Sequence, residues 1–106
     1  MTTTTTNATL EHLPTCYTIS PNFVQAEIDG VMVWYSYGTP IAFRCGGFDR
    51  VVRQNDWAQT TGRHLNHIDN GDKARRVTAE EFKKLWNDQT EAHQGRGVNF
   101  PAGKMA

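Results

Sequence analysis

The chain has 106 residues, of which 38% are hydrophobic and 21% are charged, and its formal net charge at pH 7 is zero. This length suits one compact domain and is too short for two. The composition excludes an intrinsically disordered chain, and no run approaches the roughly 18 apolar residues of a membrane span. Because the N-terminus lacks the basic and apolar regions of a secretory signal, we expect a cytoplasmic protein with no membrane partner.

Both ends of the chain differ in composition from its centre. Residues 1–9 are rich in Thr and carry no repeating apolar pattern, so we expect a disordered tail. Residues 95–106 are rich in Gly and are expected to form a flexible C-terminal tail. The sequence therefore predicts a single α+β domain over residues 10–94.

The clearest local signal is the dipeptide Asp29-Gly30, which favours the positive φ angles of a type I′ hairpin turn. Apolar residues recur at every second position before the turn, at residues 24, 26 and 28, and after it, at residues 31, 33, 35 and 37. In a two-residue hairpin the flanking residues Ile28 and Val31 pair on the same face of the sheet. Both apolar sets then lie on one side, which we predict to be the core face.

The opposite face of this hairpin carries Phe23, Met32 and Trp34 beside Gln25 and Glu27. Such a face is too apolar to be purely solvated, so either a helix or a partner must cover it.

Further strands are expected after the hairpin. Residues 41–45 resume the alternation, Gly46-Gly47 offers a turn, and residues 48–53 make another strand. We predict an antiparallel meander of about four strands over residues 22–54, with a short additional strand at residues 16–20.

Two helical segments are predicted after the strands. Thr78 and Glu81 form a T-x-x-E capping box that starts the main helix, expected over residues 78–94 and packed on the sheet. A short helical turn is expected near residues 61–68, before Asn70-Gly71 ends it.

Two runs, YSYGTPIAF at residues 35–43 and NDWAQTTGRHLN at residues 55–66, resemble a pattern found in small uncharacterised proteins of phages and plasmids. The resemblance covers roughly residues 31–82, and the chain departs from the pattern at Ala58, where Ser is expected. It implies an origin on a phage or other mobile element and supplies no catalytic residues. Phage accessory proteins of this size often inhibit host defence, so the resemblance implies an anti-CRISPR-like role.

The densest polar constellation lies between Trp57 and Asn66, where Thr60, Thr61 and His64 surround Gly62. On a functional interpretation these side chains converge on a ligand and the glycine permits close approach. On a structural interpretation a threonine caps a helix, the His and Asn satisfy backbone groups, and the Trp fills the edge of the core. The sequence leaves both interpretations open.

Catalytic and metal-dependent alternatives have weaker support. His64 and His67 lie three residues apart, but zinc requires further ligands at recognisable spacing, so we expect no metal or other cofactor. Cys16 and Cys45 are expected to be free thiols, and buried thiols on strands are usually inert. A metal-dependent enzyme centred on His64 remains an alternative.

A nucleic-acid partner is a second alternative. Residues 44–76 contain seven basic and four acidic residues, a net charge of +3, with aromatic residues among them. Such a segment can contact phosphates and stack bases of a single strand, although the excess of charge is mild.

The sequence favours a non-catalytic protein that binds a host macromolecule, most directly a protein, and a homodimer through the same surface is also possible. The predicted binding residues are aromatic, basic and polar side chains of the kinds enriched at interfaces. They are Trp34, Tyr35, Tyr37, Arg50, Arg53, Trp57, Thr60, Thr61, Arg63, His64 and Asn66.

Overall fold

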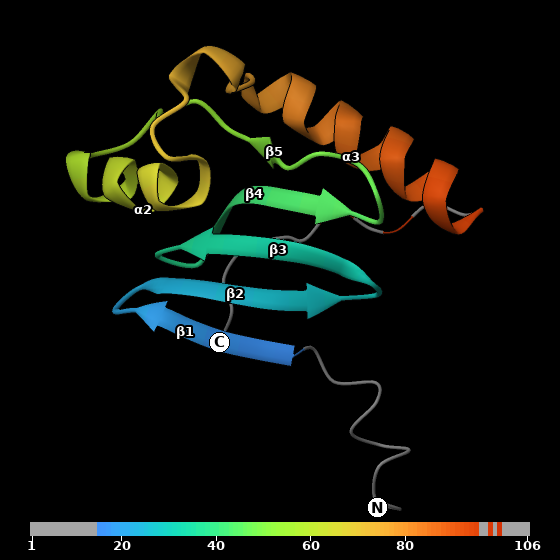
Figure 1. Ribbon diagram of the computed structural model, residues 1–106, viewed down its shortest axis with the longest axis horizontal. Coiled ribbons are helices and arrows are strands. Elements are labelled where there is room, and N and C mark those ends of the chain that lie inside the picture. Colours follow the sequence, from blue (N-terminus) through green and yellow to red (C-terminus); the bar gives the residue numbers. More distant parts are fainter. Residues whose placement is uncertain (1–14, 96–97, 99, 101–106) are drawn as a thin grey trace, which may run out of the picture.

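The computed structural model describes residues 15–95, 98 and 100 of the chain (Figure 1). It has an α+β fold in which an antiparallel sheet is followed by helices, as the sequence predicts. The strands are β1 (Thr15–Ser20), β2 (Phe23–Ile28), β3 (Val31–Ser36), β4 (Thr39–Cys45) and β5 (Val51–Val52). The helices are α2 (Gln59–Asp69), the short 3-10 helix η1 (Lys73–Arg75) and α3 (Ala79–Gln94).

The sheet is a simple meander in the order β1-β2-β3-β4-β5, and every neighbouring pair is antiparallel. The predicted hairpin at Asp29-Gly30 is confirmed, because both residues have positive φ angles and Ile28 pairs with Val31. The additional N-terminal strand is also confirmed as β1. Past β5, the backbone of Val77 bonds to Val52 and Gln54, so the segment before α3 covers that edge of the sheet.

One face of the sheet packs against α3. Alternate residues of a strand point to opposite faces, and Val31, Val33 and Tyr35 of β3 share a buried cluster with Phe82 and Trp86 of α3. The predicted core face of the hairpin and the predicted docking of the main helix are therefore confirmed.

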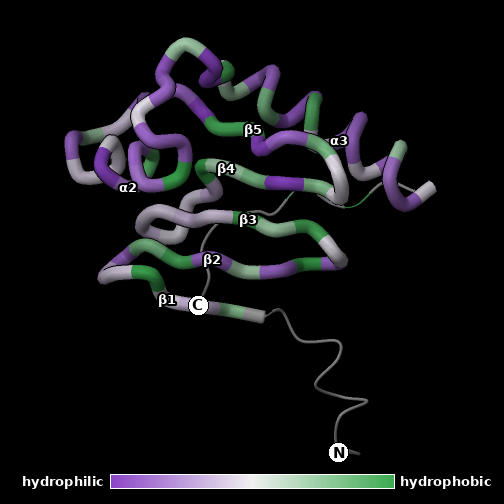
Figure 2. The backbone as a smooth tube through the Cα atoms, viewed as in Figure 1, coloured by the Kyte–Doolittle hydropathy of each residue, from purple (hydrophilic) through white to green (hydrophobic). Residues whose placement is uncertain are grey.

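The other face packs against α2, which decides between the two coverings that the sequence left open. Phe23 and Trp34 form a second buried cluster with Leu65 and Ile68 of α2. The helix therefore covers Phe23 and Trp34, which the sequence had left to either a helix or a partner. Figure 1 shows both helices beside β4 and β5, away from β1, and Figure 2 shows hydrophobic and hydrophilic residues alternating along α3.

Two elements differ in length from the prediction. The strand expected over residues 48–53 is reduced to Val51–Val52, and Phe48 lies in the preceding turn with 40% of its surface exposed. The turn expected near residues 61–68 is a full helix of 11 residues, which ends at Asn70 in the left-handed conformation. The main helix begins and ends as predicted, with Thr78 as N-cap and Gly95 as C-cap.

The core continues beyond α3. Val98 is buried in the cluster on the α3 face, where its carbonyl oxygen accepts a hydrogen bond of 2.7 Å from Nε1 of Trp86. Phe100 packs edge-on against Phe82 and Trp86. These two residues belong to the segment expected to be a flexible tail; the remainder of residues 96–106 and the Thr-rich residues 1–9 lie outside the described residues.

Candidate functional site: an aromatic pocket and a basic groove beside α2

The tight turn between β3 and β4 places Tyr37 at the surface. Ser36 pairs with Thr39, so Tyr37 and Gly38 form the two-residue loop, with φ angles of 51° and 79°. The left-handed region costs a bulky residue about 1 kcal/mol or more, and such residues concentrate at functional sites. The ring of Tyr37 remains 49% exposed, and its centroid lies 5.9 Å from that of His64.

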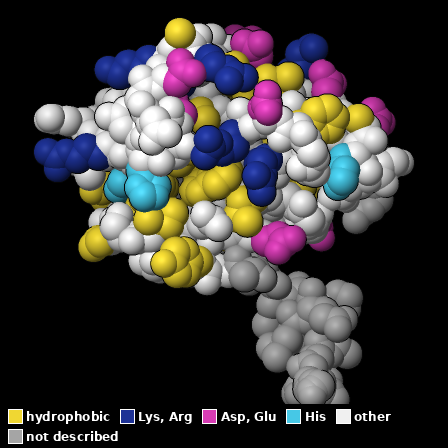
Figure 3. Space-filling view, viewed as in Figure 1, with side chains coloured by type: hydrophobic (Ala, Val, Ile, Leu, Met, Phe, Trp, Pro, Cys, Tyr) yellow, Lys and Arg dark blue, Asp and Glu magenta, His cyan; other side chains and the backbone are white. Residues whose placement is uncertain are grey.

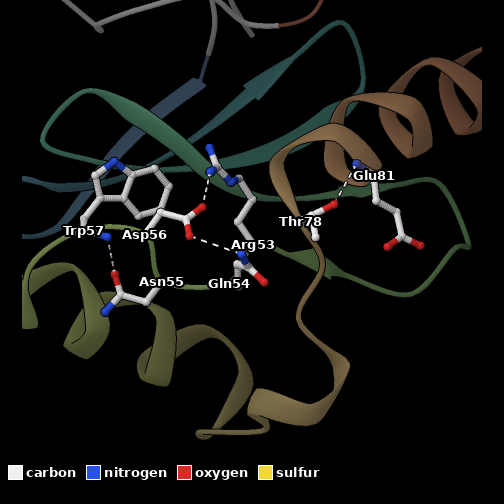
Figure 4. A network of polar contacts seen from close by, with 7 residues as sticks. All are labelled: Arg53, Gln54, Asn55, Asp56, Trp57, Thr78 and Glu81. Atoms are coloured by element: carbon white, nitrogen blue, oxygen red, sulfur yellow. Dashed lines mark hydrogen bonds and ion pairs between the residues drawn. The ribbon is translucent and has the colours of Figure 1, made fainter.

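The loop between β5 and α2 holds Trp57 in a defined position (Figure 4). The guanidinium of Arg53 lies 4.4 Å from the centroid of the indole, and Arg53 also forms an ion pair of 2.7 Å with Asp56. Asn55 accepts a hydrogen bond from the backbone N–H of Trp57. Such contacts fix an indole that is 37% exposed, and a cation over its face stabilises the arrangement by about 0.5–1 kcal/mol.

Three buried polar side chains meet between the sheet and α2. The hydroxyl of Ser36 lies 2.7 Å from Nδ1 of His64 and 3.1 Å from the hydroxyl of Thr61. All three residues are at most 7% exposed. When Nδ1 of His64 is unprotonated, Ser36 can donate to it and accept from Thr61, so the three groups can satisfy one another as buried polar groups must.

His64 is held in its neutral form by its surroundings. Burial lowers the pKa of His64, and the nearby His67 lowers it further. Its ring stacks on Phe23 with centroids 4.5 Å apart and planes inclined by 8°, while His67 meets the edge of the same Phe23 ring. His64 therefore connects α2 to both β2 and β3.

These elements enclose a pocket between the β3–β4 turn and the start of α2, here called the aromatic pocket. Its volume is about 380 Å³, within the range of about 300–1,000 Å³ of small-ligand sites. Two exposed aromatic side chains and several hydroxyls line it: Ser36, Tyr37, Thr39, Trp57, Ala58, Thr60 and Thr61. The aromatic side chains of this lining can make apolar contacts with a ligand, and its hydroxyl groups can orient that ligand through hydrogen bonds.

The first turn of α2 lacks a side-chain cap. Ala58 occupies the N-cap position with extended backbone angles, and no acidic residue lies in the first turn. This is the position at which the chain departs from the pattern that it resembles. A Ser there could accept a hydrogen bond from the helix, whereas Ala cannot.

A second depression lies on the other side of α2, here called the basic groove. Its volume is about 460 Å³. It is lined by three cations, four carboxamides and one glycine: Arg63, Lys73, Arg76, Gln54, Asn55, Gln59, Asn66 and Gly62. No carboxylate is part of this lining, although Figure 3 shows basic and acidic side chains intermixed elsewhere on the face that it displays.

A buried ion pair fixes one wall of the basic groove. Arg76 binds Asp69 through two hydrogen bonds of 2.7 and 2.9 Å, and the side chains are 4% and 11% exposed. Burial raises the pKa of Asp69, but hydrogen bonds from Arg76 and the Gly71 backbone more than offset it, so the pKa lies below its ordinary value. Arg76 also donates to Asn66, which joins η1 to α2.

The structure assembles part of the predicted constellation. Tyr37, Trp57, Thr60 and Thr61 line the aromatic pocket, and His64 lies beneath it. The structural interpretation that a threonine caps this helix is wrong, because Ala58 is the N-cap of α2 and the hydroxyl of Thr61 contacts Ser36.

The remaining predicted residues lie elsewhere. Trp34 and Tyr35 are buried, at 9% and 3% exposure, so neither is available to a partner, and burial raises the pKa of Tyr35. Arg50 lines a separate small depression with Asp49, Asp69, Asp72 and Arg75.

Arg63 and Asn66 line the basic groove, and Arg53 supports Trp57 from behind the aromatic pocket. Gly62 packs closely on Asn55, since a Cβ atom there would lie 3.0 Å from Nδ2 of that side chain.

Sequence reasoning missed the contributions of the β3–β4 turn and of η1. Ser36 and Thr39 belong to the aromatic pocket, and Lys73 and Arg76 to the basic groove. The Tyr37-Gly38 dipeptide followed by Thr39 was a usable turn signal for the first pair. Lys73 and Arg76 belong to the basic segment 44–76, but their place beside Arg63 depends on tertiary contacts such as the ion pair of Arg76 with Asp69, which spacing along the chain does not reveal.

Metal and thiol chemistry find little support in the described residues. Within residues 15–95, 98 and 100, no group of three or more His, Cys, Asp or Glu side chains is placed to hold a metal ion. Cys16 and Cys45 are free thiols, as predicted, and burial raises the pKa of Cys45. None of the helices that the structure describes is long and apolar enough to span a membrane.

Comparisons with known proteins give a family and no function. No curated protein and no solved structure matches the chain significantly. A model of a family of unknown function, DUF8033, matches residues 3–84, which include all five strands, α2 and the aromatic pocket. The chain therefore belongs to the family of unknown function DUF8033.

Proposed function

We propose that the protein is a non-catalytic binding module that engages another protein through the aromatic pocket. One observation carries the proposal: two exposed aromatic side chains, Tyr37 and Trp57, line the same pocket together with several hydroxyl groups. Tyr and Trp, with Arg, dominate the residues that contribute most to the affinity of protein interfaces.

The side chains of Tyr37 and Trp57 are already ordered in the free protein. Trp57 is held by Arg53 and by the hydrogen bond from its own N–H to Asn55, and Tyr37 is held by a rigid two-residue turn. A side chain that is already ordered loses less conformational entropy on binding, which would otherwise cost about 0.5–1.5 kcal/mol for each immobilised group. The strained backbone of Tyr37 has no role in the core, which favours a role at the surface.

The partner we propose is a protein of the host cell, and the setting is the host cytoplasm. The support is the resemblance of residues 35–43 and 55–66 to proteins of phages and plasmids. Binding without catalysis would make the protein a stoichiometric inhibitor, and host-defence proteins are the class of target that this resemblance favours.

A catalytic role for Ser36 and His64 has less support. A serine nucleophile needs a base that a third group orients, and Ser36 is 2% exposed. Among the described residues, no hydrogen bond to Nε2 of His64 is found. We therefore propose that this pair stabilises the fold, and we expect no covalent labelling of Ser36 by a fluorophosphonate probe.

The proposal is tested by affinity capture from a bacterial lysate with mass spectrometry, using the tagged wild type, Trp57→Ala and Tyr17→Ala. Tyr17 is the matched control, because it is 62% exposed on β1 and lines neither depression. A protein captured by the wild type and by Tyr17→Ala, and lost with Trp57→Ala, is the expected result. Equal capture by all three proteins would contradict the proposal.

A second copy of the chain is the alternative occupant of the aromatic pocket. Light scattering of the purified protein separates the two cases. A dimer that Trp57→Ala converts to a monomer would show that the aromatic pocket binds a second copy of the chain.

A further inference from the structure

We infer that the basic groove is a binding site for single-stranded nucleic acid, separate from the aromatic pocket and independent of the protein-binding proposal. The two depressions share no lining residue and lie on opposite sides of the first turn of α2. The inference depends on the charges, the carboxamides and the shape of the basic groove.

Two cations in the basic groove have no acidic partner among the described residues. Arg63 projects from α2 and Lys73 from η1, and neither forms an ion pair there, whereas Arg76 is neutralised by Asp69. Arg76 instead links the segment after η1 to α2 through its contacts with Asn66 and Asp69, which fixes the positions of the two elements that carry Lys73 and Arg63. Uncompensated cations on two walls of one groove are suited to a chain of phosphates.

The carboxamides add groups that can read bases. Each carboxamide carries both donors and an acceptor, as base edges do. Gln59 makes no hydrogen bond to the described residues, and Gln54 uses only its Nε2, towards Asp56. Asn66 accepts from Arg76 and so keeps its Nδ2 as a donor. An acidic peptide would offer carboxylates to the donors, and only its backbone N–H groups could donate to the acceptor of Gln54.

The shape of the groove favours a single strand over a duplex. Its volume of about 460 Å³, bounded by α2 and η1, can receive a nucleotide whose base is turned out of a stack. In a duplex the faces of the bases are stacked and only their edges are exposed in its grooves, whereas an unpaired base can enter the depression as a whole. Recognition of single strands combines a cationic groove with contacts to the bases.

Fluorescence anisotropy with labelled oligo(dT) and oligo(rU) of about 15 nucleotides tests the inference, over a range of salt concentrations. We expect binding whose affinity falls with salt by a slope of about −0.7 for each phosphate contacted. Arg63→Glu and Lys73→Glu should each weaken binding by about tenfold or more and make the slope shallower. The control is Lys83→Glu, an equal charge change at an exposed position of α3, which should bind as the wild type does.

Three results would overturn the inference: no binding of either oligonucleotide at low salt, an equal loss of affinity in Lys83→Glu, or equally tight binding of a duplex or of an oligoglutamate peptide of the same charge. Circular dichroism of each variant establishes that the fold is retained. Trp57→Ala should leave oligonucleotide binding unchanged, so failure of this inference and failure of the protein-binding proposal give different results.

Discussion

Tyr37 shows how one residue can be unfavourable for the fold and useful at the surface. The alternation of β3 placed it on the core face with Tyr35, but the chain turns after Ser36 and leaves its ring exposed. Asn before Gly is the preferred pair for a type I′ turn, so a tyrosine here is a costly choice for the backbone. Sequence reasoning selected Tyr37 as a binding residue for its type, while its position in a turn came only from the structure.

The buried group of Ser36, Thr61 and His64 was predicted only in part. The sequence marked Thr61 and His64 because they lie close together in the chain, but Ser36 is 25 and 28 residues away from them. The contact exists because α2 packs across β3. A strand pattern cannot reveal which helix crosses a given residue, so the third member was missed.

This group predicts a dependence of stability on pH. The pKa of His64 is lowered in the folded protein, whereas the unfolded chain takes up a proton near pH 6.5. The unfolded state therefore binds more protons below about pH 6.5. As the pH is lowered through this range, the free energy of unfolding decreases by at most about 1.4 kcal/mol per pH unit because of this group. His64→Gln should flatten the profile between pH 7.5 and 5, measured by urea unfolding.

Asp69 does not contribute to this window. Its pKa is lowered, so the stability from its ion pair with Arg76 is present above the ordinary carboxyl range and is lost only in stronger acid.

Parallel pH profiles for the wild type and His64→Gln would contradict the account of a buried, neutral histidine.

At the scale of elements, α3 was predicted closely and α2 was not. The start of α3 was predicted from the T-x-x-E capping box, and in the structure Thr78 accepts a hydrogen bond of 3.2 Å from the N–H of Glu81. The start of α2 carries no such signal, because its N-cap is Ala58. Its length follows from burial of Leu65 and Ile68 against the sheet, a tertiary contact that local patterns report only weakly.

The missing cap predicts a stabilising substitution. Ala58→Ser should raise the free energy of unfolding by about 1 kcal/mol, because a Ser at the N-cap can accept from an N–H of the first turn. Thr78→Ala, which removes the existing cap of α3, should lower it by a similar amount. Chemical denaturation of both variants measures the two effects. An Ala58→Ser protein no more stable than the wild type would show that the first turn of α2 already has its partners.

At the scale of the whole molecule, the sequence predicted the meander and a main helix packed on it, but left open whether a helix or a partner covers the second sheet face. The composition of this second face was interpreted correctly as too apolar to be exposed to solvent. Because the segment that forms α2 was expected only as a short turn, the sequence could not decide between the two coverings. With α2 at its full length, Trp34 is core, and the exposed aromatic side chains of the aromatic pocket become the binding candidates.

The position of the aromatic pocket explains how a small domain can separate stability from binding. Its walls are a turn and a helix start, which lie outside the two buried clusters. Substitutions of its exposed residues should therefore change recognition while the sheet and both helices persist.

The most direct test of this account is the Tyr37→Asn variant, studied by calorimetric titration with the captured partner and by thermal unfolding. We predict that its affinity falls by tenfold or more, a loss of about 1.4 kcal/mol, while its unfolding temperature stays equal or rises because Asn-Gly suits the turn. Undiminished affinity in a folded Tyr37→Asn protein would contradict the assignment of the aromatic pocket as the binding site.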